Sequence, residues 1–371
     1  MQRRAFLKSG AVLAGAAMVP VGARSAPASA ATSTALSPDE QGWRLFELTS
    51  RVEIPSDGST RVWLPLPSMH EATWLRPQGN LWQGNARDMR IVSAPTSGVQ
   101  MLYAEWDAGA APPRELELVS RFAARDRSID LSSPADPPPL DAAERERYTS
   151  PTRLLPTDGI VRDTALRITA DSDGDLARAR ALYDWVVENT FRDPAVRGCG
   201  LGDVRFMLET GDLSGKCADL NALYVGLARA AGLPARDLYG VRVTESRLGF
   251  RALGKSGDCT KGQHCRAEVW LDGFGWVPVD PADVRKVALE EPPGNLSLDA
   301  EPVARARALL FGGWEMNWLA YNDAHDVALP GSDGAELPYL MYPQAEVNGG
   351  RLDPLDPASF SYQIRSRELT G

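Results

Sequence analysis

A cysteine at the start of a predicted helix is the residue in this sequence best placed to act as a nucleophile. Cys217 lies in LSGKCADLNALYVGLARAAGLPAR, residues 213–236, where a glycine-containing loop precedes a helix with an apolar face. The unpaired backbone N–H groups and the dipole at a helix N-terminus lower the pKa of a thiol and favour the thiolate. The same N–H groups can receive the oxyanion of an acyl intermediate. The alternative is an ordinary small core residue, so the chain must also supply a base.

A histidine on a predicted strand is the candidate base. In KGQHCRAEVWLDGFGWVPVDPAD, alternation places His264 and Arg266 on one face of a strand, and a DGFG turn returns the chain. Pairing of Trp270 with Trp276 would set the register. Asp280 would then lie opposite Arg266, on the same face as His264 and one diagonal step from it. An aspartate that accepts from one ring nitrogen fixes the tautomer and leaves the other nitrogen facing the thiol.

Zinc binding is a competing interpretation of the same region. Cys259, His264 and Cys265 are residue types that bind zinc. Their spacing lacks a CxxC pair, and strand alternation sends His264 and Cys265 to opposite faces. We therefore favour a catalytic over a metal-binding role for His264, and no metal or organic cofactor is implied.

Two further polar residues are expected to have structural roles. His325 is followed by Asp326, but adjacent residues rarely pair usefully and no hairpin supports the pair, so we interpret His325 as a satisfied or surface histidine. Asp219 lies two residues after Cys217 and is expected to cap the helix or to contact Lys216.

The sequence before these motifs predicts a β-domain. Residues 42–130 alternate apolar and polar side chains in segments such as FELTSRVEI and RELELVSRF, separated by turn residues. This pattern is typical of an antiparallel β-sandwich. Residues 131–156 form a polar, proline-rich segment, which we interpret as a linker between two domains.

The candidate site lies in a second region with a different periodicity. Residues 157–290 contain the helical pattern DGDLARARALYDWVVENTF, then the Cys217 helix, then strands such as DLYGVRV and CRAEVWL. Helices followed by several strands indicate an α+β core. Residues 291–371 are expected to pack on this core or on the β-domain.

The N-terminus predicts export. Residues 1–30 combine twin arginines, a short apolar run and a small-residue cleavage site, which resembles a twin-arginine signal peptide, and residues 31–41 would follow as a linker. The apolar run is short of the roughly 20 residues that a membrane span needs. We therefore expect a periplasmic or secreted protein without stable membrane insertion after signal removal.

Charge and cysteine content limit the partners. Cleavage after residue 30 removes four basic residues and no acidic one, which moves the net charge from −9 to −13. Such an acidic protein is not expected to bind nucleic acid through phosphate contacts. In an oxidising compartment one disulfide among Cys199, Cys259 and Cys265 is plausible, and the sequence does not choose the pair.

The motifs GKCADLNALYVGLARAAGLPAR and HCRAEVWLDGFGWVPVD, in Cys–His–Asp order, resemble the transglutaminase-like superfamily. The resemblance covers about residues 157–287. It implies a papain-like α+β core, with the cysteine at the start of the central helix and the histidine and aspartate on successive strands. It also implies a nucleophile at Cys217, a general base and acid at His264 and an orienting group at Asp280. No assured side-chain oxyanion donor precedes the cysteine.

These features predict an exported, cysteine-dependent enzyme that acts on peptide or glutamine-type amides through a thioester. Water as the acceptor would make it a hydrolase, and a lysine amine would make it a crosslinking transferase. A protein or peptide of the cell envelope is the expected substrate by location. The alternative is a catalytically silent binding module, and a third interpretation is a Cys217 thiol blocked by a disulfide.

Overall fold

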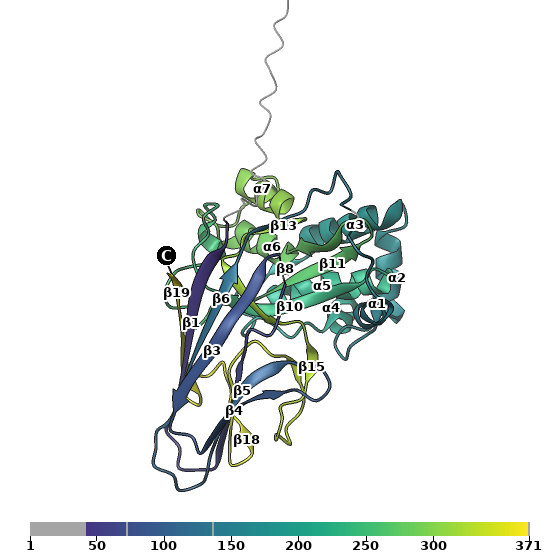
Figure 1. Cartoon of the computed structure of the whole chain (residues 1–371). Coiled ribbons are helices and arrows are strands. Elements are labelled where there is room, and N and C mark those ends of the chain that lie inside the picture. Colours follow the sequence, from purple (N-terminus) through teal and green to yellow (C-terminus); the bar gives the residue numbers. More distant parts are fainter. Residues whose placement is uncertain (1–41, 72, 136, 370–371) are drawn as a thin grey trace, which may run out of the picture. The chain divides into compact units, whose positions relative to one another are not determined.

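The computed structural model describes residues 42–369, except 72 and 136 (Figure 1). The predicted signal peptide, 1–30, and the linker 31–41 lie outside the described residues. Within the described ranges the chain forms seven α-helices and one short 3-10 helix. They are α1 (Ala142–Thr149), α2 (Gly159–Ile168), α3 (Gly174–Asn189), α4 (Val204–Thr210), α5 (Cys217–Ala230), α6 (Pro281–Glu290), α7 (Glu301–Leu309) and η1 (Arg251–Leu253).

Two antiparallel sheets form the β-rich part of the protein. The first has the order β19-β1-β6-β3, made of Ser361–Leu369, Arg44–Ile54, Arg114–Ala124 and Leu75–Gly84. The second has the order β18-β17-β2-β5-β4, made of Gly350–Arg351, Gln344–Val347, Thr60–Pro65, Gln100–Trp106 and Asp88–Ser93. Buried side chains of both sheets share one apolar cluster, which includes Val52, Val62, Leu102 and Leu116. The predicted N-terminal β-sandwich is confirmed, and strands from the C-terminal segment complete it.

A third antiparallel sheet carries the candidate site. Its order is β12-β11-β10-β14, made of Gly275–Val279, Gln263–Leu271, Ala235–Arg242 and Trp318–Asn322. Helix α5 packs on β10 and β11 (Figure 1). The remaining strands form three short pairs: β7 (Arg127–Ser128) with β13 (Gly313–Trp314), β8 (Phe191–Arg192) with β9 (Ser214–Gly215), and β15 (His325–Val327) with β16 (Leu337–Tyr339). The α+β class is confirmed.

Helix α5 is buried on all sides, which its sequence explains. Every residue from Cys217 to Arg229 is buried, and the helix is rich in alanine and leucine. A helix that is apolar all round belongs in the interior of a domain. The chain leaves the helix through Gly232, whose φ of +84° is in the left-handed region that suits a helix C-terminus. The predicted stop at Gly232 is therefore confirmed.

The register of the β11–β12 hairpin is the predicted one. Trp270 lies opposite Trp276 and Ala267 lies opposite Val279. The next residue, Asp280, leaves the strand and becomes the N-cap of α6. The hairpin thus delivers Asp280 to the face of the sheet that carries His264.

The segment 291–371 contributes to both parts of the protein. β14 pairs with β10 in the core sheet, while β17 pairs with β2 and β19 pairs with β1 in the sandwich. Helix α1 lies within residues 131–156, the segment that the sequence analysis interprets as a linker. The predicted domain boundaries stay predictions. In the part of the chain that the structure describes, none of the helices combines the length and apolar character needed to cross a membrane.

Candidate active site

The N-terminus of α5 places the Cys217 thiol in a buried cluster of sulfur atoms. Cys217 is the first residue of the helix and is 4% exposed. Its sulfur contacts the thiols of Cys199 and Cys265 and the ring of His264. Hydrogen bonding from Cys199 and then from Cys265 brings the pKa of Cys217 well below its ordinary value, assisted by His264 and opposed by burial. All four cysteines are free thiols.

A carboxylate fixes the loop that brings Cys199 to Cys217. Asp219 Oδ1 accepts hydrogen bonds from the backbone N–H groups of Leu201 and Gly202, both at 3.0 Å. Its Oδ2 accepts from the backbone N–H of Lys216 at 2.9 Å. The preceding loop residue, Gly200, has a φ of +92°, and a Cβ there would lie 1.8 Å from Asp219 Oδ2. Asp219 therefore has the expected structural role, and it joins the loop to the start of α5.

His264 and Asp280 form a buried hydrogen-bonded pair. The ring Nε2 lies 2.8 Å from Asp280 Oδ2, and the two residues are 4% and 0% exposed. The other carboxylate oxygen, Oδ1, accepts from Asn221 Nδ2 at 3.2 Å and from the backbone N–H of Asp283 at 3.0 Å. Because Nε2 is occupied by Asp280, the nitrogen left to face Cys217 is Nδ1. The structure thus brings together all three residues predicted from the sequence.

The surroundings of His264 favour the imidazolium. Burial and then the Arg242 guanidinium lower the pKa of His264, but the carboxylates of Asp283 and Asp280 outweigh them, so the pKa is raised. A raised histidine pKa next to a lowered cysteine pKa favours a thiolate–imidazolium pair. This is the protonation state in which a thiol attacks and an imidazolium protonates a leaving amine.

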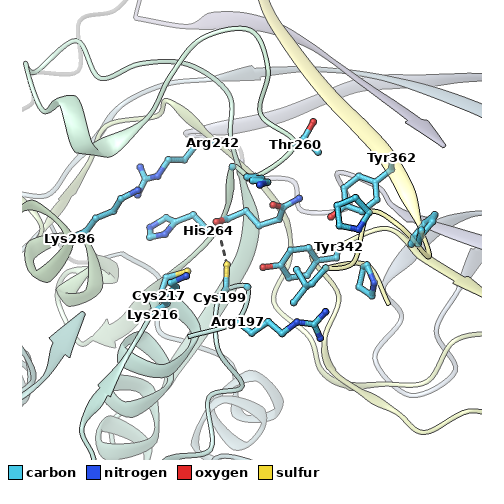
Figure 2. A pocket seen from close by; sticks show the side chains of 18 of the residues that line it. Arg197, Cys199, Lys216, Cys217, Arg242, Thr260, His264, Lys286, Tyr342 and Tyr362 are labelled. Carbon is cyan, nitrogen blue, oxygen red and sulfur yellow. Dashed lines mark hydrogen bonds between the residues drawn. The ribbon is translucent and has the colours of Figure 1, made fainter. Parts of the chain in front are cut away.

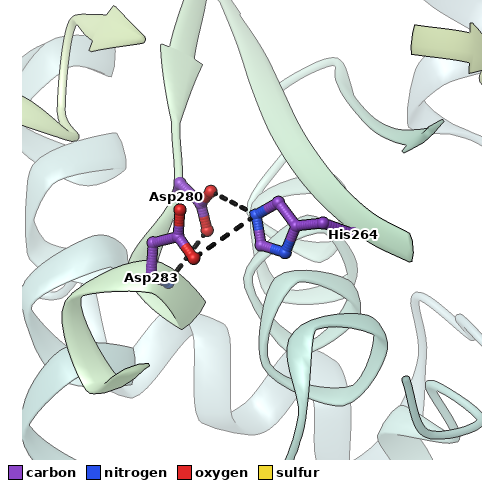
Figure 3. Close-up of side chains that lie close together, drawn as sticks. All are labelled: His264, Asp280 and Asp283. Atoms are coloured by element: carbon purple, nitrogen blue, oxygen red, sulfur yellow. Dashed lines mark hydrogen bonds and ion pairs between the residues drawn. The ribbon is translucent and has the colours of Figure 1, made fainter. Parts of the chain in front are cut away.

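A second carboxylate, Asp283, was not predicted from the sequence. Its Oδ1 lies 3.5 Å from His264 Nε2 (Figure 3). Both of its carboxylate oxygens accept from Arg242. Burial raises the pKa of Asp283, but Arg242 and then His264 hold it well below its usual range. The spacing in Asp280-Pro-Ala-Asp283 is that of an N-cap residue and an acid at position N3, a signal that could have placed Asp283 in the site.

The cluster of His264, Asp280 and Asp283 has the composition of a metal site. One candidate ligand atom from each lies within 4.8 Å of the others. However, Asp283 is engaged by Arg242, and Arg266 Nε lies 3.5 Å from Asp280 Oδ2. Two guanidinium groups already neutralise these carboxylates, and they would repel a divalent cation. The cluster fits a histidine held by carboxylates better than a metal centre.

The structure also places the residues of the other sequence alternatives. Among the described residues, Cys259 is in no group of three candidate ligands with His264 and Cys265. His325 approaches Tyr239 Oη at 3.4 Å through Nδ1 and Asp237 Oδ2 at 3.3 Å through Nε2. His325 therefore has neighbours other than Cys217, but its buried Nε2 forms no hydrogen bond with the described residues, so the predicted satisfied histidine is not confirmed.

A cavity of about 360 Å³ opens onto Cys217 and His264. The core forms one wall, and the C-terminal segment forms the opposite wall with Tyr342 and Tyr362 (Figure 2). Sequence reasoning missed this second wall because it depends on pairings between strands far apart in the chain. The arrangement gives a ligand access to the sulfur while most of the reacting side chains stay buried.

Comparison with known proteins agrees with this geometry. Residues 162–281 match the family model described as the Transglutaminase-like superfamily. The chain is 36% identical over 344 residues to an uncharacterized protein of Haemophilus influenzae, with 88% of this chain and 92% of the relative covered. The chain belongs to the transglutaminase-like superfamily. In this transglutaminase-like protein the family match contains Cys217 and His264 and reaches Asp280.

Solved structures with lower sequence similarity were also found for the transglutaminase-like protein. A proposed cysteine protease from Cytophaga hutchinsonii is 13% identical, with a TM-score of 0.49 and coverage of 88% of this chain and 98% of that one. The periplasmic domain of TgpA from Pseudomonas aeruginosa is 17% identical, with a TM-score of 0.36 and coverage of 67% and 90%.

Proposed function

We propose that this protein is a cysteine-dependent enzyme that acts on a peptide or glutamine-type amide through a thioester. It either transfers the acyl group to an amine or hydrolyses the amide bond. In this proposal Cys217 is the nucleophile, His264 is the general acid and base, and Asp280 orients the ring. The observation that carries the proposal is the buried 2.8 Å contact between His264 and Asp280 beside a thiol of lowered pKa.

The proposed reaction has two halves. The Cys217 thiolate attacks the amide carbonyl carbon, and the oxyanion is received by the Cys217 backbone N–H, which at a helix start has no intrahelical partner. The C–N bond breaks, the leaving amine takes the proton of the His264 imidazolium, and a thioester remains. Water or an amine then attacks the thioester while His264 takes its proton, and the thiolate leaves.

Alkylation of the thiol tests the proposal without a known substrate. We expect iodoacetamide to modify Cys217 rapidly at pH 6, as read by peptide mass spectrometry, and we expect His264→Ala to remove this reactivity. Cys259 is a matched internal control because it is buried and its pKa is raised by burial. Equal, slow labelling of Cys217 and Cys259 would instead support the alternative, a catalytically silent binding module.

A substrate screen then identifies the acceptor. Peptides incubated with and without a primary amine would be compared between the wild type and Cys217→Ala by mass spectrometry. A mass change equal to the added amine minus ammonia indicates a transferase, and chain cleavage or deamidation indicates a hydrolase. Product formation by Cys217→Ala at the wild-type rate would refute the role of Cys217.

We also propose that the protein acts in the periplasm or outside the cell. The twin-arginine pattern and cleavage-site residues within residues 1–30 support this location. The test is N-terminal sequencing of the protein from fractionated cells. Recovery of the full-length chain only in the cytoplasm would refute export.

A further inference from the structure

The cavity at Cys217 is lined by cationic side chains in a protein that is acidic overall. The chain has a formal net charge of −9. The cavity lining contains six lysines and arginines and, among the described residues, no aspartate or glutamate. The six are Arg192, Arg197, Lys216, Arg242, Lys261 and Lys286. A concave surface of one charge sign concentrates ligands of the opposite sign.

Four of these cations are already neutralised within the protein. Arg192 pairs with Glu290, Arg197 with Asp353 and Arg242 with Asp283, while Lys286 Nζ lies 3.7 Å from Glu290. Their carboxylate partners are not among the residues that line the cavity. Burial, and then the charge of Arg242, lower the pKa of Lys286. Arg242 and Lys286 therefore repel each other in spite of these ion pairs, and a bound anion would relieve that repulsion.

Two of the cations have no carboxylate partner among the described residues. Lys216 directly precedes Cys217 and is half-buried, whereas Lys261 is exposed three residues before His264. The two lysines therefore flank the proposed nucleophile and base in sequence, and both line the same cavity. Their ammonium groups remain available for a ligand.

An unused hydrogen-bond donor lies beside them. Within the described residues, the side-chain Nε2 of Gln263 is buried and has no hydrogen-bond partner. Gln263 is next to His264 and lines the cavity. Since an unpaired buried donor is costly, its presence in a ligand-accessible cavity indicates a partner from outside the protein. The donor is independent of the lysine charges and points to an acceptor oxygen.

The opposite wall is apolar. The C-terminal segment supplies aromatic, leucine and proline side chains to the cavity: Tyr342, Pro354, Leu355, Pro357, Phe360 and Tyr362. Figure 2 shows Tyr342 and Tyr362 across the cavity from Arg242 and Lys286. A ligand between the walls would place an anionic group on the core side and an apolar surface on the C-terminal side.

We propose that the substrate is a peptide that carries a carboxylate close to the amide that Cys217 attacks, with Lys216, Lys261 and Gln263 binding this carboxylate. This inference rests on the proposed function, because it assigns the substrate class of the same site. The carboxylate comes from an acidic side chain or from a free C-terminus, and the chemistry of recognition is the same for both.

Charged and neutral alkylating agents test the inference. The rate of Cys217 alkylation is measured with iodoacetate and with iodoacetamide at pH 7. The ratio of the iodoacetate rate to the iodoacetamide rate is then divided by the same ratio for free 2-mercaptoethanol. We expect this normalised ratio to exceed one at low salt and to fall as salt is added. Lys216→Gln and Lys261→Gln should each lower it roughly threefold, the effect of one unit charge about 7 Å away in water. Arg167→Gln, an exposed residue of α2 outside the cavity lining, is the matched control and should not change it.

Peptide binding tests the inference independently of the chemistry. Four N-acetylated peptides, Ala-Glu-Ala and Ala-Gln-Ala with free or amidated C-termini, would be tested on Cys217→Ala by saturation-transfer NMR. We expect the carboxylate-bearing peptides to give stronger signals than the fully neutral peptide. Comparison of the two singly charged peptides distinguishes recognition of a side-chain carboxylate from recognition of a terminal carboxylate. Adding Lys216→Gln and Lys261→Gln should abolish the difference.

The two experiments distinguish the possible failures. A Cys217 that iodoacetamide does not modify, together with preferential binding of charged peptides, would refute the proposed enzyme and leave the anion site standing. A reactive Cys217 with a normalised ratio unchanged by both lysine substitutions, or equal binding of all four peptides, would overturn the anion site alone.

Discussion

The Nε2 atom of His264 lies 2.8 Å from Oδ2 of Asp280, although the two residues belong to different secondary-structure elements. Asp280 is itself held, because its Oδ1 accepts from Asn221 and from the backbone of Asp283. The carboxylate can therefore fix the orientation of the imidazole. A fixed ring presents Nδ1 to Cys217 without the entropy cost of ordering it during a reaction.

Replacing the carboxylate by an amide should weaken the pair. We expect Asp280→Asn to lower the rate of Cys217 alkylation at pH 6 by about tenfold, since an adjacent carboxylate shifts a partner's pKa by about one unit or more. Asp163→Asn, which changes an exposed carboxylate of α2, is the control. Equal rates for the wild type and Asp280→Asn, measured with iodoacetamide, would show that the carboxylate does not govern His264.

The contact between His264 and Asp280 was predictable because it depends on local geometry. The two residues lie on consecutive segments joined by a short turn, and side chains alternate with a period of two along a strand. Once Trp270 lies opposite Trp276, the place of Asp280 follows. The same short-range logic predicted the start of α5 at Cys217 and its end before Gly232.

The contacts that were missed depend on residues brought together from a distance. Cys199 reaches Cys217 through a loop that Asp219 holds, and no periodic pattern encodes that loop. Arg242 reaches Asp283 only because β10 pairs with β11 and α6 follows the hairpin. Tyr362 enters the cavity on β19, which is positioned by pairing with β1. Such long-range pairings are not determined by local propensity.

Removing the Cys199 thiol should raise the pKa of Cys217. The Cys199 S–H donates to the Gln263 carbonyl oxygen at 3.4 Å. Cys199 also contacts Cys217 and is the largest cause of the lowered pKa of Cys217. We expect Cys199→Ala to move the midpoint of the pH profile for Cys217 alkylation upward by about one unit. Cys259→Ala removes a buried thiol elsewhere and should leave the midpoint in place. A Cys199→Ala profile that overlays the wild type would contradict this role.

The loop before the nucleophile should not tolerate a side chain at Gly200. Gly200 has a φ of +92°, and an added Cβ would collide with Asp219 Oδ2. Gly211→Ala is a matched control, because Gly211 has a φ of +72° but nothing within 4 Å of an added Cβ. We expect Gly200→Ala to reduce the free energy of unfolding by about 1–3 kcal/mol more than Gly211→Ala, as measured in urea. Equal losses for the two variants would show that the loop adapts without cost.

A buried ion network next to the site should matter for stability. Glu268 is 0% exposed and accepts from Arg127 and Arg236, which hold its pKa below the usual range against the effect of burial. We expect Glu268→Gln to reduce the free energy of unfolding by about 3–5 kcal/mol, because it leaves the buried Arg127 guanidinium without its carboxylate partner. In contrast, Glu117→Gln removes the partner of the exposed residue Arg51 and should cost at most about 1 kcal/mol. Similar denaturation midpoints for the two variants would contradict the assigned importance of burial.

The pH dependence of the network has a defined sign. The pKa of Glu268 is lower in the folded protein than in the unfolded chain. Its stabilising effect is therefore fully present above the unfolded pKa of about 4.3 and is lost as the pH falls through the folded value. The difference in unfolding free energy between the wild type and Glu268→Gln should accordingly shrink in that acidic window.

The thiolate–imidazolium pair predicts a shallow pH profile for Cys217. Its pKa is lowered and that of His264 is raised, so the ion pair should persist between those two values. The contribution of His264 to folding stability is present below about pH 6.5 and is lost as the pH rises through its folded pKa. The contribution of Cys217 is present above about pH 8.5 and is lost as the pH falls through its folded pKa.

Alkylation between pH 8 and pH 6 measures this directly. An ordinary thiol with a pKa of about 8.5 loses roughly 75-fold in reactivity over this interval, because its thiolate fraction falls. We expect Cys217 to change by less than about threefold in the wild type and to change more steeply with pH in His264→Ala. Free 2-mercaptoethanol supplies the reference curve in the same buffers. A wild-type profile as steep as that reference would mean that Cys217 is protonated at neutral pH and that His264 does not activate it.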